Sequence, residues 1–157
     1  EQSLDIMQWA LAQNDPRHWS TLGQTVHAQA LEWVSLCDGE FKQNLDRYKY
    51  PNRYELQDGL AHREAGSAFL QKLNARLTES VCLMGANWTW VDAAIAPFVR
   101  QFARTDRTWF DAQTWSALKG WLENFEQSPD YLEVMHKYKV WNQDAKPVAF
   151  PATPAMN

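Results

Sequence analysis

The 157-residue sequence has little of several things that would define a class of protein. Its two cysteines, Cys37 and Cys82, lie far apart and outside any CxxC pair, so they provide neither a disulfide framework nor a thiolate metal site. The four histidines stand singly, which leaves no metal-ligand spacing. No stretch approaches the roughly 20 apolar residues needed to cross a bilayer, and no basic segment followed by an apolar run opens the chain. We therefore expect a cytoplasmic protein without a metal.

The sequence also lacks an excess of positive charge, because its formal net charge is −4. Such a chain repels phosphate backbones and anionic lipid headgroups, so neither nucleic acid nor a membrane surface is expected as a partner. One segment, from Asp46 to Tyr54, mixes basic and aromatic residues in the way that can bind single-stranded nucleic acid. Its short span and its proline favour a solvated loop between two helices instead.

Aromatic residues are abundant. Nine Trp, seven Phe and five Tyr need large packed surfaces or a pocket, and the 45% of apolar residues is ordinary for a globular protein. A chain of this length buries about two-thirds of the surface that its unfolded form exposes, so it can hold a full core.

Apolar positions recur at helical spacing along almost the whole chain, and no sustained alternation marks a strand. The sequence therefore predicts an all-α protein, a helical bundle. A first short helix, with Leu4, Met7 and Leu11 on one face, ends before the Asp15-Pro16 pair. The other predicted helices run from after Gly23 to about Leu45, from near Leu60 to about Thr78, from Thr89 to about Arg104, through 115–125, and from Ser128 onward, followed after Trp141 by an extended proline-containing tail.

The most informative segment is the entrance to the fourth of these helices, residues 83–97. Thr89 and Asp92 have the spacing of a capping box, with Asp in place of Glu. The Thr89 hydroxyl accepts from the Asp92 amide and the Asp92 carboxylate accepts from the Thr89 amide, which satisfies two otherwise unpaired donors. The apolar residues that follow predict a helix entrance buried inside a domain.

This segment resembles the capping box of the sixth helix in the glutathione transferase superfamily. The resemblance extends from Gln2 to about Trp141 and implies the helical C-terminal domain of such a protein. It implies that residues 1–15 are the last helix of a thioredoxin-like domain and the start of a linker. Residues 16–157 would then form the helical domain with its extended tail.

The resemblance also implies binding residues. In the superfamily an acidic residue or Gln followed by Ser holds the γ-glutamyl end of glutathione, and Gln2 and Ser3 match that motif. Taken alone, Ser3 reads as an ordinary helix cap. The same resemblance makes Trp33, Cys37 and Phe41 candidates for the wall of a cleft that binds the hydrophobic co-substrate. Their other interpretation is core packing.

No catalytic residue is expected in this sequence, since neither cysteine has a neighbouring feature that would lower its pKa. The expected function is therefore the co-substrate wall of a glutathione S-transferase, used in conjugation or thiol transfer by a full-length, homodimeric protein. Glutathione and a hydrophobic electrophile would be its ligands. The alternative is a non-catalytic member of the superfamily that serves as a protein-interaction module, which the fold alone does not separate from an enzyme.

Overall fold

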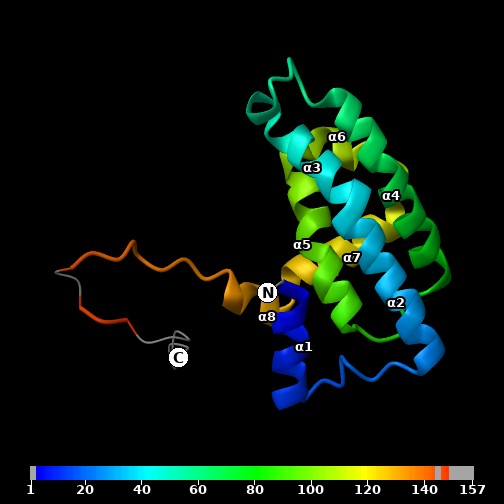
Figure 1. Cartoon of the computed structure of the whole chain (residues 1–157), viewed down its shortest axis with the longest axis vertical. Coiled ribbons are helices and arrows are strands. Elements are labelled where there is room, and N and C mark those ends of the chain that lie inside the picture. Colours follow the sequence, from blue (N-terminus) through cyan, green and yellow to red (C-terminus); the bar gives the residue numbers. More distant parts are fainter. Residues whose placement is uncertain (1–2, 144–145, 149–157) are drawn as a thin grey trace. The chain divides into compact units, whose positions relative to one another are not determined.

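The computed structural model describes residues 3–143 and 146–148, and within these residues the protein is all-α, as predicted (Figure 1). The regular elements are the helices α1 (Ser3–Gln13), α2 (Gln24–Leu36), α3 (Lys42–Lys49), α4 (Leu60–Glu79), α5 (Trp90–Thr105), α6 (Arg107–Asp111), α7 (Ser116–Gln127) and α8 (Pro129–Val134), with a π-helical turn η1 (Cys37–Phe41) and a 3₁₀ turn η2 (Pro51–Tyr54). In the described part of the chain, the one strand-like pairing is an isolated bridge between Cys82 and Gly85.

The chain divides into two compact units, Glu1–Leu122 and Glu123–Asn157. In the first unit, α3 packs on both α4 and α5, and α2 packs on α5. Its core holds a cluster of phenylalanines in which the centre of the Phe41 ring lies 4.6 Å from the centre of the Phe69 ring and 5.6 Å from that of Phe102. The aromatic load of the sequence is thus used in packing between helices, where each ring removes a large apolar area from water.

In the smaller unit, α8 begins as the sequence predicts. The Ser128 side chain accepts a hydrogen bond from the Tyr131 amide at 3.2 Å, and Pro129 occupies the first turn. The rings of Phe125 and Tyr131 lie 4.7 Å apart. No helix is assigned to residues 136–143 and 146–148, while the rest of the predicted tail lies outside the described residues.

The second predicted helix, from after Gly23 to about Leu45, is not one regular helix, because η1 separates α2 from α3 and the Gly39 backbone is non-helical. The helical run also extends further than expected, and the predicted loop is correspondingly shorter. Asp46 to Lys49 are helical, not a loop, because Tyr48 continues the apolar stripe of Phe41 and Leu45 and is buried against Phe102 at 4.9 Å. The Lys49 ammonium also donates to the Gln101 side chain at 2.9 Å. The loop prediction failed because the charged residues between these buried positions masked the helical period.

Helix α6 was not predicted. Asp106 ends α5 and caps α6, and its carboxylate accepts from the Trp109 amide at 3.0 Å. The Arg63 guanidinium lies 4.4 Å from the centre of the Trp109 ring and 3.6 Å from the Asp106 carboxylate, which fixes this corner against α4. A five-residue helix held by such long-range contacts leaves almost no periodic signal in the sequence.

Gly59 precedes α4 at a very close backbone approach. A Cβ atom on Gly59 would lie 2.5 Å from the Tyr48 carbonyl oxygen and 2.6 Å from its Cα, both of which are backbone atoms. We expect Gly59→Ala to lower the free energy of unfolding by about 1–3 kcal/mol, since the chain must shift to accept the methyl group. Urea denaturation of the purified variant measures this effect.

Gly120 provides the matched control for that substitution. It lies inside α7, with no atom within 4 Å of the position that a Cβ would take. Gly120→Ala is expected to raise the free energy of unfolding by about 0.5–1 kcal/mol, because glycine weakens a helix interior. Equal effects of the two substitutions would contradict the close approach at Gly59.

Candidate functional site

Both bonds of the Thr89–Asp92 capping box are present at the start of α5. The Asp92 carboxylate accepts from the Thr89 amide at 3.0 Å and from the Thr89 hydroxyl at 2.9 Å. It also accepts from the Leu83 amide at 2.9 Å and the Trp121 indole N–H at 3.0 Å. Asp92 therefore joins the 80–89 loop, α5 and α7, which makes it an organising residue of the fold.

Asp92 has no solvent-exposed surface. Burial raises the pKa of its carboxyl above the ordinary value, while the bonds from Leu83, Trp121 and Thr89 act in the opposite direction. All four contacts come from donors, so each favours a carboxylate as the acceptor. The residue has no free face on which to meet a ligand, and its role is structural.

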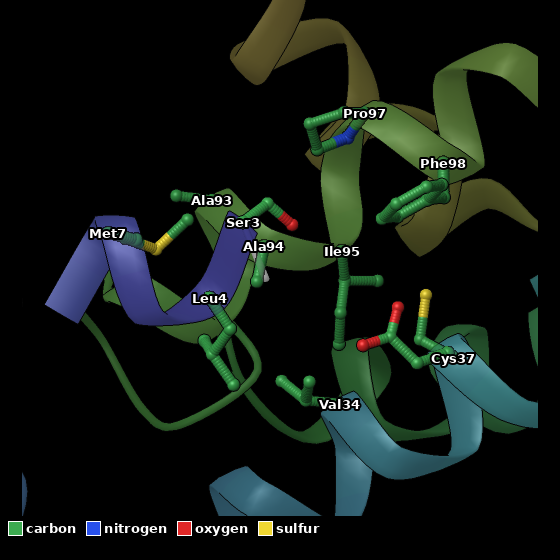
Figure 2. A pocket seen from close by; sticks show the side chains of 11 residues that line it. Ser3, Leu4, Met7, Val34, Cys37, Ala93, Ala94, Ile95, Pro97 and Phe98 are labelled. Atoms are coloured by element: carbon green, nitrogen blue, oxygen red, sulfur yellow. The ribbon is translucent and has the colours of Figure 1, made fainter. Parts of the chain in front are cut away.

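A hollow of about 220 Å³ lies where α1 meets the α2–η1 region and α5. We call it the α1–α5 hollow. Figure 2 shows Ser3 and Leu4 of α1 facing Ala94 and Ile95 of α5, with Val34 and Cys37 on the third side. Its described lining is mostly apolar and consists of Ser3, Leu4, Met7, Val34, Cys37, Asp38, Ala93, Ala94, Ile95, Pro97 and Phe98. A small apolar concavity with a few polar groups is the usual form of a ligand site.

Helix α1 reaches this place through an ordered linker. The Asp15 carboxylate accepts from the Trp19 amide at 2.8 Å and the Ser20 amide at 2.9 Å, and also from the Ser20 hydroxyl. These bonds, chiefly those from Ser20, lower the pKa of the Asp15 carboxyl below its ordinary value. The Trp19 carbonyl in turn accepts from the Trp90 amide at 3.3 Å, at the first residue of α5. The linker is thus tied to the same helix that lines the hollow.

The two faces of α1 differ in burial. Leu4, Met7 and Leu11, the predicted inner face, are half-buried. Ile6 and Trp9 on the rest of the helix are 60% and 66% exposed. Helix α1 has no fully buried residue, so its apolar side chains keep part of their surface in contact with water.

The sequence-predicted binding residues do not all meet. Ser3 and Cys37 both line the α1–α5 hollow, while Gln2 lies outside the described residues. Phe41 is 1% exposed in the phenylalanine cluster of the core. Trp33 lies with its ring 6.1 Å from Phe69 and lines a separate hollow between α2 and α4. The arrangement of Phe41 and Trp33 fits the core-packing interpretation better than a shared wall.

The Cys37 thiol is buried, and desolvation with the nearby Asp38 carboxylate raises its pKa to about 12. Burial, with a contribution from Asp92, raises the pKa of Cys82 to about 11. Both thiols are therefore protonated at neutral pH and are poor nucleophiles. In the α1–α5 hollow, Cys37 acts as a small apolar lining residue.

Sequence reasoning named no individual α5 residue as part of such a cleft. Ala93, Pro97, Ala94 and Phe98 form two pairs four residues apart, so they share one side of the helix. This spacing was visible in the sequence after the capping box. The small side chains of Ala93 and Ala94 line the hollow together with the larger Phe98.

Metal binding and membrane insertion find no support in the described part of the chain. Its His, Cys, Asp and Glu residues form no group of three or more that could hold a metal ion. None of its helices combines the length and the apolar character that a bilayer span requires.

Comparison with known proteins identifies the family of the chain. The family model described as the glutathione S-transferase C-terminal domain matches residues 32–124, which is more than half of the chain. The chain therefore belongs to the family of glutathione S-transferase C-terminal domains. The match includes the predicted capping box and the helices α3 to α6. Neither the curated proteins nor the solved structures include one that matches the chain.

Proposed function

We propose that this chain provides one wall of the hydrophobic co-substrate site in a glutathione S-transferase-type protein, and that the α1–α5 hollow is that wall. The observation that carries the proposal is the hollow itself, an apolar concavity lined by three segments of which two lie at least partly within the family match. An apolar electrophile loses unfavourable contact with water when it enters such a space.

The proposal includes the glutathione side of the site. Residues 1–15 would be the last helix of a thioredoxin-like half and the start of a linker, and residues 16–157 the helical domain. Gln2 and Ser3 would then hold the γ-glutamyl end of glutathione. Two observations support this placement: Ser3 lines the hollow, and Ile6 and Trp9 leave apolar surface for an adjoining domain.

The nucleophile of the reaction would be a glutathione thiolate, activated by a group that we do not find among the described residues. Cys37 does not fit that role, because its thiol is protonated and is held among apolar neighbours. Homodimer formation and a cytoplasmic location belong to the same proposal, with family membership as their support.

Filling the hollow tests the proposal. Ala94 is half-buried and lines the hollow, so Ala94→Trp should occupy the space and weaken binding of a neutral aromatic probe, 1-naphthylmethanol, at least tenfold. Isothermal titration calorimetry on the 157-residue chain measures the affinity. Ala93→Phe offers a second way to fill the same space.

The matched control is Ala61→Trp, which adds the same side chain at an exposed position of α4 away from the hollow. It should leave the affinity for the probe unchanged, and circular dichroism should show equal helix content in all variants. A probe that binds equally well to the variants with the filled hollow, or that does not bind to the unmodified chain, would overturn the proposal.

A further inference from the structure

The charge in the described lining of the α1–α5 hollow comes from one acidic residue. Of its described lining residues, Asp38 is the one with a charged side chain, and the others are apolar or neutral. The Asp38 side chain is 43% exposed, so its carboxylate is accessible at the edge of an otherwise apolar space. A ligand in the hollow therefore has one anionic group beside it.

A lysine outside the lining balances this charge in part. The Lys42 ammonium lies 3.8 Å from the Asp38 carboxylate, one helical turn further along the chain, and 4.9 Å from the centre of the Phe98 ring. Both partners of the pair are about half exposed, and such pairs contribute little to stability. A cationic group on a ligand can thus compete with Lys42 for Asp38 at small cost.

We propose that Asp38 determines the charge preference of this site, so that the hollow selects an apolar ligand bearing a cationic group over an anionic ligand of the same shape. The inference rests on the proposed function, because it assumes that the hollow binds an apolar ligand. The ring system of the ligand lies among Leu4, Val34 and Ile95, and its ammonium group lies at Asp38. An anionic group at that place meets a like charge, in a chain whose net charge is −4.

The expected selectivity is modest and measurable. A half-exposed contact between unlike charges corresponds to about a two- to fivefold preference for the cationic probe over the neutral one, and salt reduces it. Three probes of one size separate charge from shape: 1-naphthylmethylammonium, 1-naphthylmethanol and 1-naphthoate. We expect the dissociation constants of the 157-residue chain to increase in that order at low ionic strength.

Two variants at the edge of the hollow then test the role of Asp38. Asp38→Asn keeps the shape and removes the charge, so the three probes should bind with nearly equal affinity. Lys42→Gln removes the competing cation and should widen the preference for the ammonium probe. Methyl chemical shifts of Ile95 and Met7 report whether each probe binds in the hollow.

The outcomes distinguish this inference from the proposed function. If the three probes bind equally to the unmodified chain and none binds to Ala94→Trp, the proposed charge selection is wrong and the proposed co-substrate wall still stands. A preference that survives in Asp38→Asn overturns the charge selection as well. If no probe binds, or if Ala94→Trp has no effect, both the wall and the charge selection fail.

Discussion

Asp92→Ala is expected to lower the free energy of unfolding by about 3–5 kcal/mol. The substitution leaves the amides of Leu83 and Thr89 and the indole N–H of Trp121 without their acceptor in the core. Each buried donor without a partner costs about 1–3 kcal/mol, and the capping of α5 is lost as well. Chemical denaturation followed by circular dichroism measures the change.

Asp92→Asn should recover only part of this stability, because an amide has one acceptor oxygen where the carboxylate has two. Glu79→Gln is the control for removing a carboxylate charge, since the Glu79 side chain is 74% exposed and only loosely paired with Arg76. It should change the free energy of unfolding by less than about 0.5 kcal/mol. A loss below about 1 kcal/mol in Asp92→Ala would show that the buried hydrogen-bond network does not stabilise the fold.

Phe41→Ala is expected to cost about 3–5 kcal/mol of stability. The Phe41 ring is fully enclosed between Phe69 and Phe102, so its removal leaves a cavity that these rings cannot close without shifting. The same substitution should leave the affinity for 1-naphthylmethanol nearly unchanged, because Phe41 does not line the α1–α5 hollow. Denaturation and calorimetry on one protein preparation measure both quantities.

Leu36→Ala provides the comparison from the same helical region. Leu36 is 39% exposed, so its truncation removes less buried apolar surface and should cost about 1 kcal/mol or less. If Phe41→Ala proved mildly destabilising but strongly weakened probe binding, Phe41 would be a ligand-contacting residue, as the family resemblance implied.

Local signals in the sequence predicted much of the fold. The first residues of α5 and α8 were predicted from Thr89 with Asp92 and from Ser128 with Pro129. Such predictions are possible because an N-cap depends on residues within one turn of each other. The end of α1 before Asp15-Pro16 followed from the steric effect of proline on the residue before it. By contrast, α6 depends on Arg63, about forty positions away, and no local pattern could predict it.

The site was only partly predictable for a geometric reason. Trp33, Cys37 and Phe41 follow one another at four-residue steps, which would place them on one side of a regular helix. The chain departs from a regular α-helix at η1, where the Gly39 backbone is non-helical, and Cys37 lines the hollow beside α5 while Phe41 and Trp33 contact Phe69 of α4. The direction in which each side chain points depends on which helices pack beside it, and the spacing of residues in the sequence does not give this packing.

Asp38 illustrates a second limit. In the sequence, Asp38 and Lys42 have the spacing of an ordinary ion pair on a solvated helix face. Only the packing of α1 and α5 around the π-helical turn encloses the space beside the carboxylate. Asp38, which the sequence pattern places on a solvated surface, is thus the one charged residue among the described residues that line the hollow.

The bond between the Trp19 carbonyl and the Trp90 amide has a mechanical consequence. It links the connection between α1 and α2 to the first turn of α5, which the Asp92 carboxylate caps. Loss of that bond would remove one of the links that hold the connection from α1 beside α5. The proposed ligand wall therefore depends in part on a carboxylate that does not line the hollow.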